Sequence, residues 1–296
     1  MSAVPVPAKP ERDDGVMSEP QSPAQPIVRV LPRTATEPAE SSASSPLHVT
    51  YTQTAVRNDL GSRLMLCAGV VRRDRSELAE SFRMLRTQVL QRLRQDKHTV
   101  LAVTSARPAQ GKSLTALNLA LTITAEQDCT VLLVDADLSG TGLQSLFGLS
   151  GLNGLGEHLG QALPLPELLI NPGVDRFVLL PAGCGSHLDS AELLASRAAQ
   201  QLVQELRARY TDRIIIFDLP PLLEQADTLA FLPQTQASLL VVEQGTTASA
   251  DLELAAQLLA PFNLIGSVLS RPAPRPSKRR WLPPLPWLRK AQDTHG

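Results

Sequence analysis

The sequence predicts an α/β fold in which a parallel β-sheet is covered by helices on both faces. Six short apolar runs lie between residues 99 and 269, and helical patterns alternate with most of them. Runs without polar alternation are typical of strands that are buried on both faces of a parallel sheet. The 24 prolines are unevenly placed, with nine in residues 1–50 and six in residues 271–296. We therefore expect a disordered Pro/Ser-rich arm over 1–56, one domain over 57–270 and a tail over 271–296.

The helices are predicted from apolar residues that recur every three or four positions. In residues 74–97 this repeat consists of Leu78, Phe82, Leu85, Val89 and Leu93. Similar repeats predict helices over 113–126, 190–210 and 248–259. The apolar runs predict strands at 99–104, 131–134, 177–180, 213–217, 238–242 and 264–269, with a loop-rich stretch between the second and third strands.

Composition excludes several classes of protein. No uncharged apolar run approaches the ~18 residues of a membrane span, and the first residues lack the apolar core of a secretory signal, so we expect a cytoplasmic location. The three cysteines form no Cys-x-x-Cys pair, which argues against a disulfide framework or a zinc site and favours small buried side chains. Because 28 basic residues balance 29 acidic ones, we expect no nucleic-acid partner.

Polar segments follow three of the predicted strands, and ligands bind where the carboxyl ends of parallel strands meet. The first segment runs from Ser105 to Ser113, ends in Gly111-Lys112-Ser113 and precedes a helix. A phosphate-binding loop needs backbone N–H groups at a helix N-terminus, a lysine for the outer phosphates and a hydroxyl for Mg²⁺. The strict pattern would place its first glycine at Ala106, so the motif is incomplete.

The second and third segments bring carboxylates to the same sheet edge. Asp135 and Asp137 follow one strand, and Asp218 follows another. Taken singly, each aspartate is more typical of a turn or a helix cap than of a metal site. Together with a lysine loop at the same edge, they predict a site for a Mg²⁺-nucleotide, in which carboxylates hold the metal directly or through water.

With these motifs, the sequence resembles the bacterial tyrosine kinases (BY-kinases), MinD/ParA-related P-loop proteins associated with capsular and extracellular polysaccharide. The resemblance spans about 77–269 and depends on four segments: Glu80-Ser-Phe-Arg83-Met-Leu-Arg86, the loop ending Gly111-Lys112-Ser113, Val134-Asp135-Ala-Asp137, and Asp218-Leu-Pro-Pro221. Two more segments, Leu179–Gly183 and Glu192–Ser196, are similar to autokinases encoded with exopolysaccharide and exosortase loci.

The resemblance implies a role for each motif residue. ATP phosphates would lie on Ala109, Gln110, Gly111, Lys112, Ser113 and Leu114. Mg²⁺ would be held by Ser113, Asp135, Asp137 and Asp218. Lys112, Asp135 and Asp137 would be catalytic, with Asp135 beside the attacking hydroxyl as the candidate base. The implied reaction is transfer of the γ-phosphoryl group to a tyrosine hydroxyl.

The sequence departs from the family pattern at four places. Ala109 stands where the family's phosphate loop has a glycine, so its Cβ meets a backbone that approaches phosphate or needs a positive φ. Ser139 replaces an arginine, and Ser270 replaces an asparagine expected at the base. No tyrosine follows Tyr210, which removes the family's C-terminal acceptor cluster and leaves Tyr51, in the arm, as the candidate acceptor.

The resemblance also implies partners. Glu80, Arg83 and Arg86 lie on one helical face, which is typical of a solvated surface but in this family forms contacts between subunits of a homo-oligomer. A membrane-bound polysaccharide chain-length regulator is expected in trans, placing the protein at the inner face of the plasma membrane. The tail 271–296 combines basic residues with both tryptophans, which suits an anionic membrane surface, a polyproline ligand or a solvated segment.

Two functions from different classes remain open. The first is an ATP-dependent protein-tyrosine kinase that regulates polysaccharide polymerisation or export. The second is a catalytically weak, nucleotide-dependent assembly switch in the same pathway. A small-molecule kinase or a DNA-partitioning ATPase explains the arginine helix less well, and the latter would need a more basic surface.

Overall fold

The computed structural model describes residues 54–66, 69–71, 76–139, 142–149, 151–184, 190–209 and 213–270. Its strands are β1 Ala55–Val56, β2 Val100–Ser105, β3 Thr130–Asp135, β4 Ile170–Asn171, β5 Phe177–Leu180, β6 Arg213–Asp218, β7 Ala237–Glu243 and β8 Leu264–Ser270. Most of the predicted arm and the whole tail 271–296 lie outside the described residues, whereas Ala55 and Val56, expected in the arm, form an edge strand.

The helices are α1 Asn58–Leu66, α2 Glu77–Gln95, α3 Lys112–Ile123, α4 Leu143–Phe147, α5 Leu155–Gln161, α6 Leu165–Leu168, α7 Ser190–Ala195, α8 Arg197–Arg209, α9 Asp227–Phe231 and α10 Ser249–Leu259. Two 3-10 turns cover Leu232–Gln234 and Ala260–Phe262. No helix in the described part of the chain is long and apolar enough to cross a bilayer. The loop-rich stretch contains α4, α5, α6 and β4, which sequence periodicity missed because each is shorter than two helical turns or a normal strand.

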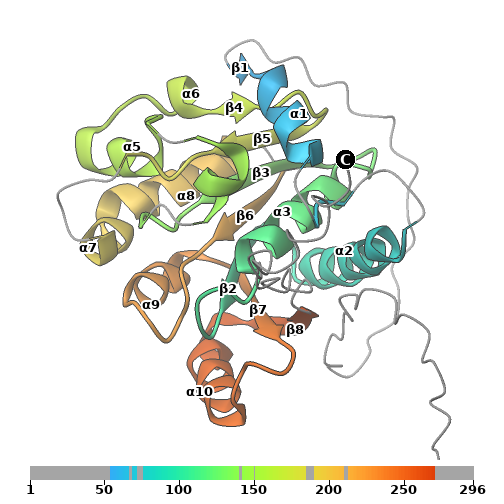
Figure 1. The fold of residues 1–296 in the computed structure, drawn as a ribbon. Helices are drawn as coiled ribbons and strands as arrows, with labels where there is room; N and C mark the ends of the chain where they lie inside the picture. Colours follow the sequence, from blue (N-terminus) through green and yellow to red (C-terminus); the bar gives the residue numbers. More distant parts are fainter. Residues whose placement is uncertain are drawn as a thin grey trace, which may run out of the picture.

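The sheet has the strand order β1-β4-β5-β3-β6-β2-β7-β8 (Figure 1). In this order, the last six strands, β5-β3-β6-β2-β7-β8, all pair in parallel, which confirms the predicted parallel sheet. The sequence did not predict the two short strands at one edge, where β4 pairs antiparallel with β5 and β1 pairs in parallel with β4. An antiparallel pair needs no helical crossover, so the short connection between β4 and β5 is enough to join them.

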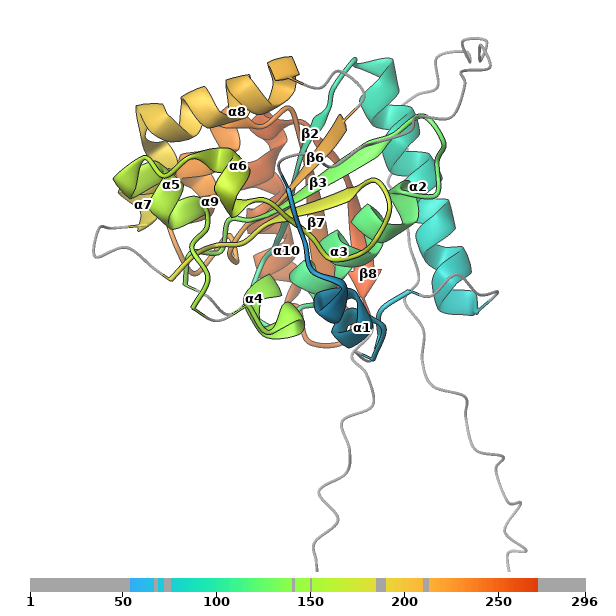
Figure 2. The same ribbon diagram turned by 90° about the horizontal axis from the view of Figure 1, so that it is seen from above.

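Helices cover both faces of the sheet (Figure 2). Successive side chains of a strand point to opposite faces, so Leu133 packs with α2 and α3 while Leu132 packs with α8 on the other side. The helix predicted over 74–97 is confirmed as α2. Ser76 caps it by accepting a hydrogen bond from Ala79 N at 3.2 Å.

The helix predicted over 190–210 is divided into α7 and α8 at Ser196. Ser196 Oγ accepts a hydrogen bond from Ala199 N at 3.2 Å, so this serine caps the new helix instead of continuing the old one. The prediction that the cysteines are buried holds for Cys129 and is wrong for Cys184, which is exposed, while Cys67 lies outside the described residues.

Ser196→Ala should lower the free energy of unfolding by about 1 kcal/mol, because it removes the side chain that caps α8. Ser196→Asp keeps an oxygen acceptor at the cap and should stay close to the parent protein. Urea unfolding followed by far-UV circular dichroism measures both. Equal losses for the two variants would contradict the capping role.

Candidate nucleotide-binding site

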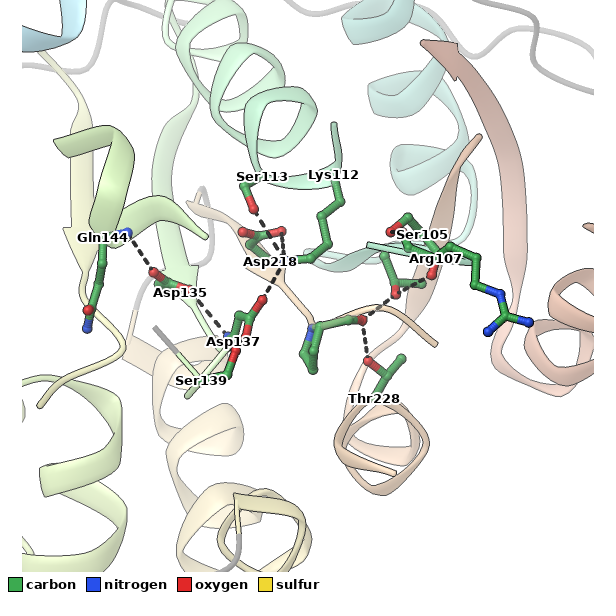
Figure 3. Close-up of polar contacts among 12 residues, drawn as sticks. Ser105, Arg107, Lys112, Ser113, Asp135, Asp137, Ser139, Gln144, Asp218 and Thr228 are labelled. Carbon is green, nitrogen blue, oxygen red and sulfur yellow. Dashed lines mark hydrogen bonds and ion pairs between the residues drawn. The ribbon is translucent and has the colours of Figure 1, made fainter. Parts of the chain in front are cut away.

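The predicted polar loops meet at the carboxyl ends of β2, β3 and β6 (Figure 3). Asp135 and Asp218 are the last residues of neighbouring parallel strands, and the pairing register places them directly opposite each other. Neighbouring strands lie about 4.8 Å apart, so the register alone brings the two carboxylates together. The prediction that these aspartates share one sheet edge with the lysine loop is confirmed by the strand order.

Lys112 lies among the carboxylates rather than in solvent. Its Nζ is 2.8 Å from Asp137 Oδ2, 3.3 Å from Ser113 Oγ and 3.7 Å from Asp218 Oδ1. Burial acts to lower the pKa of this ammonium, but the charges of Asp218 and Asp137 act against it, and the lysine pKa ends above its ordinary value. Lys112 is therefore a charged group held in a buried site, as a phosphate-binding lysine must be.

Two of the carboxylates are strongly perturbed. Burial, together with the charges of Asp218 and Asp137, raises the pKa of Asp135 well above its usual range. Burial also raises the pKa of Asp218 to about 6, although Lys112 and the Ser113 hydroxyl oppose that rise. The site therefore gathers more negative charge than one lysine neutralises, and a further cation would stabilise it.

The oxygen atoms at this edge fit Mg²⁺. Three side-chain oxygens face Gly142. A Cβ at this residue would lie 3.0 Å from Ser113 Oγ, 3.2 Å from Asp218 Oδ2 and 3.6 Å from Asp135 Oδ1. Glycine, which has no Cβ, leaves the space between these oxygens open. Ser113 lies beside Asp218 (Figure 3), yet neither buried oxygen of Asp218 accepts a hydrogen bond of good geometry. Buried acceptors without donors are suited to a metal ion.

No group of three or more acidic, histidine or cysteine side chains in the described part of the chain is arranged to hold a metal by itself. Mg²⁺ is usually bound by one or two carboxylates with substrate phosphates and water, so this finding agrees with a site that is completed by the nucleotide.

Asp137 differs from the other two aspartates because both of its oxygens are engaged. Oδ2 accepts a hydrogen bond from Lys112, and Oδ1 accepts one from Ser139. Asp137 is thus the counter-ion of Lys112 in this arrangement, and its predicted part in the metal shell stays a prediction. Ser139, which stands where the family has an arginine, supplies a hydroxyl to Asp137 in place of a cation.

The phosphate loop has two residues with a positive φ, and only one of them is a glycine. Gly111 has a φ of 83° and begins α3 without a side-chain cap, so the first N–H groups of the helix face the site. Ala109 has a φ of 61°, in the left-handed region that favours glycine. The strain expected at Ala109 from the sequence is confirmed by this angle.

The side chains of two predicted nucleotide-binding residues point elsewhere. Gln110 Nε2 donates to Thr247 Oγ1 at 2.6 Å, and the carbonyl of Gln110 accepts from Ser270 Oγ at 2.8 Å. Ser270, which stands where the family has an asparagine, therefore braces the loop. Leu114 packs into the core beside Gly69, so only its backbone can serve phosphate.

Arg107 is fixed on the outer side of the phosphate loop. Its guanidinium binds Asp251 through two nitrogens, at 3.0 and 2.9 Å, and Glu224 at 2.8 Å. The hydrogen bonds that it donates to Asp251, and then to Glu224, raise the pKa of this arginine further above its ordinary range. These contacts tie the phosphate loop to α10 and to the segment after β6.

Sequence reasoning missed the residues that hold Asp135 and Asp218 in place. The carbonyl of Pro220, two residues after Asp218, accepts hydrogen bonds from the buried hydroxyls of Thr104 and Thr228, each at 2.7 Å. Asp135 Oδ2 accepts from the backbone N–H of Gln144 at 3.2 Å. The Pro220-Pro221 pair was a usable signal, because two prolines without N–H groups leave carbonyls that need donors from other elements.

The predicted oligomerisation residues lie on α2, outside the carboxylate cluster. Arg83 Nε donates to Glu80 Oε2 at 2.9 Å on the same helix. Arg86 is used within the chain, with Nε 3.0 Å from Glu126 Oε1 and Nη1 donating to Thr122 O at 3.1 Å. A contact between subunits through these residues stays a prediction.

No family model matches the chain. Among curated proteins it is 30% identical over 218 residues to tyrosine-protein kinase YwqD of Bacillus subtilis, covering 73% of the chain and 90% of that protein. It is 35% identical over 182 residues to the succinoglycan biosynthesis transport protein ExoP of Rhizobium meliloti, covering 61% of the chain but only 23% of ExoP. The kinase domain of Escherichia coli tyrosine kinase ETK has a similar structure, with a TM-score of 0.61 and 28% identity over 68% of the chain and 78% of that domain.

The fold and the lysine-carboxylate edge define a P-loop protein of the α/β class. The likeness to YwqD, which extends over most of both chains, identifies the family more narrowly. The chain belongs to the bacterial tyrosine kinase (BY-kinase) family.

Ala109→Gly should raise the free energy of unfolding by up to about 1 kcal/mol. Relief of a left-handed backbone gains ~1–2 kcal/mol, and the added freedom of glycine in the unfolded chain returns ~0.5–1 kcal/mol. Lys97→Gly is a matched control, because Lys97 has a φ of 53° on an exposed turn away from the site. Chemical denaturation measures both, and a clear loss of stability in Ala109→Gly would contradict strain at this position.

Thr104→Val and Thr228→Val should each weaken Mg²⁺-dependent ATP binding, and the double variant should lose more than the two single losses together. Either single substitution leaves the Pro220 carbonyl with one donor. The double variant leaves this buried carbonyl without a donor, which costs roughly 1–3 kcal/mol. Thr→Ser at either position keeps the hydroxyl and should bind like the parent. The measurement is nucleotide binding by calorimetry over a range of Mg²⁺ concentrations, and strict additivity would contradict a shared carbonyl.

Proposed function

We propose that this protein binds Mg²⁺-ATP and transfers the γ-phosphoryl group to a tyrosine hydroxyl. The observation that carries this proposal is the placement of Lys112 Nζ within 3.7 Å of oxygens on Asp137 and Asp218, at the N-terminus of α3. Membership of the BY-kinase family supports tyrosine as the acceptor.

In the proposed reaction, each element has a task that follows from its position. The N–H groups at the start of α3 hold the phosphates, and Lys112 exchanges its contact with Asp137 for phosphate oxygens. Mg²⁺, held by Ser113 and Asp218 with Asp135 nearby, would supply neutralisation of charge on the outer phosphates. Asp135, fixed by the N–H groups of Gln144 and Asp137, orients the attacking hydroxyl.

The pathway is proposed from the relatives. ExoP is named for succinoglycan biosynthesis transport, and this chain spans only a quarter of its length. We infer that the chain acts in polysaccharide polymerisation or export with a membrane-bound chain-length regulator in trans. It would lie at the inner face of the plasma membrane through that partner, as a homo-oligomer that uses Glu80, Arg83 and Arg86. The tail 271–296, proposed to touch an anionic membrane surface, lies outside the described residues.

A second candidate is a nucleotide-dependent assembly switch with weak phosphoryl transfer. Specific observations favour it: the strained backbone at Ala109, the loss of a cation at Ser139 and the scarcity of tyrosine, with two in 296 residues. In this version, ATP binding would change the oligomer without chemistry on a protein acceptor.

The two candidates separate in one assay, with a Glu/Tyr random copolymer as acceptor. Lys112→Ala should reduce phosphotyrosine formation by on the order of 10²-fold or more, because it removes the charge that follows the transferred phosphoryl group. Lys97→Ala, at an exposed lysine away from the site, should leave the rate unchanged. Quantitative phosphotyrosine mass spectrometry gives the rate, and calorimetry gives ATP binding.

Absence of phosphotyrosine in the parent protein, with ATP still bound, would reject the kinase and favour the switch. Circular dichroism of Lys112→Ala is the necessary control, because removing the lysine leaves three buried carboxylates without their counter-ion.

A further inference from the structure

A buried carboxylate near the site, Glu157 on α5, has no part in the proposed reaction, although only 4% of its surface is exposed. We propose that Glu157 and Gln144 are positioning residues, which together hold the Asp135 carboxylate in the geometry that phosphoryl transfer needs. The proposal rests on the proposed kinase function and goes beyond it, because both side chains act through Asp135 rather than on the nucleotide or the metal.

The turn that follows β5, residues Pro181–Cys184, lies beside Asp135 at the carboxyl edge of the sheet, and we call it the β5 turn. β5 pairs in parallel with β3, and its last residue, Leu180, lies opposite Val134, one residue before Asp135. The β5 turn therefore begins at the level of Asp135, one strand spacing of about 4.8 Å away. Asp218 flanks Asp135 on the other side, because β6 is the second neighbour of β3.

Gln144 joins Asp135 to the β5 turn. Its backbone N–H donates to Asp135 Oδ2 at 3.2 Å (Figure 3), and its side-chain nitrogen Nε2 donates to the carbonyl of Gly183. Gln144 is 8% exposed and is the second residue of α4, a helix whose start at Gly142 has no side-chain cap. The Gln144 amide therefore fixes the beginning of a short helix, and with it the N–H group that Asp135 receives.

Glu157 holds the β5 turn in the shape that presents this carbonyl. Its Oε1 accepts a hydrogen bond from Cys184 N at 3.0 Å, and its Oε2 accepts one from Gly154 N at 2.7 Å. Gly183 has a φ of 105°, and a Cβ at this residue would overlap the Glu157 carboxylate. The close approach of the carboxylate to the turn is therefore possible only because residue 183 is a glycine.

A simpler role for Glu157 is to cap its own helix, since a glutamate at the third helical position commonly accepts from the N-cap N–H. The contact with Gly154 N is of this kind. The contact with Cys184 is not, because it joins α5 to a different segment. The first two N–H groups of α5 also donate to the two carbonyls before Gly183, at 2.8 and 2.9 Å. The start of α5 thus fixes the β5 turn as a whole, and the next carbonyl of that turn is the one that Gln144 uses.

The expected effect of this chain of contacts is on the rate of transfer rather than on ATP binding. In the proposed reaction Asp135 orients the attacking hydroxyl, and a misplacement of about 1 Å can slow a reaction by on the order of 10²-fold. ATP binding depends instead on Lys112 and the first N–H groups of α3, which belong to other elements. Loss of either positioning residue should therefore lower kcat and leave the KM for ATP in place.

The first test measures kcat and the KM for ATP with full-length protein, Mg²⁺ and a Glu/Tyr copolymer. Gln144→Met keeps the length of the side chain and removes its donor, and Glu157→Gln keeps the size and replaces one acceptor oxygen by a donor. Each should lower kcat by about tenfold, with the KM for ATP within about twofold of the parent. Gln161→Met, at the exposed end of α5, is the matched control and should behave like the parent.

The double variant tests whether the two residues act in series. If Glu157 works through the β5 turn and Gln144, the double variant should lose no more kcat than the more damaging single substitution. Losses that multiply would mean that the residues act independently, and they would overturn the proposed chain of contacts.

A second measurement does not depend on activity. Hydrogen exchange of the Gln144 backbone amide, whose proton is bonded to Asp135, should be at least about fivefold faster in Glu157→Gln than in the parent without ligand. Exchange in the core strand β6 should stay unchanged, which excludes general unfolding as the cause. Unchanged exchange at Gln144 would overturn the link from Glu157 to Asp135.

The two measurements separate the positioning role from the kinase function. An active parent with unchanged kcat in both single variants, or with a raised KM for ATP alone, would overturn the positioning role and leave the kinase function standing. A parent that forms no phosphotyrosine would overturn the kinase function, and hydrogen exchange would still decide whether Glu157 holds Asp135 in place.

Discussion

A buried ammonium among three buried carboxylates is the interaction on which this structure's site depends. The β3–β6 register puts Asp135 beside Asp218, which is unfavourable for two acids in a dry environment. Lys112 offsets part of that repulsion through Asp137 and Asp218. The negative charge that Lys112 does not neutralise gives this sheet edge its affinity for a cation. The same balance of charges therefore sets both the stability of the unliganded site and its affinity for Mg²⁺.

The surrounding polar contacts hold this charged group in one geometry. Thr104 and Thr228 fix the Pro220 carbonyl after β6, and Gln144 fixes Asp135 after β3. Arg107 joins the outer side of the phosphate loop to Asp251 on α10. Each contact links elements that are far apart in sequence, so the positions of the charged atoms are set by the whole sheet edge rather than by the phosphate loop alone.

Where the sequence departs from the family's motifs, other contacts hold the phosphate loop and its neighbours in place. Ala109 accepts a left-handed backbone without the freedom of glycine, and Ser270 replaces a side chain expected at the base with a hydroxyl that braces Gln110. Ser139 exchanges a cation for a hydrogen bond to Asp137. The site therefore holds its lysine and carboxylates in position with fewer charges and fewer glycines than the family pattern has.

The sequence by itself determined the parallel centre of the sheet, helix α2, the phosphate loop and the positions of the three aspartates. The sheet and helix follow from local patterns of apolar residues, and the loop and aspartates follow from polar residues next to strand ends. It did not determine the antiparallel β4, the break at Ser196 or the threonines on Pro220. These depend on pairing partners and on buried carbonyls that need donors, both supplied by distant residues. The tertiary structure alone decided which aspartate pairs with Lys112 and where β1 joins the sheet, because strand direction and register are properties of the assembled sheet.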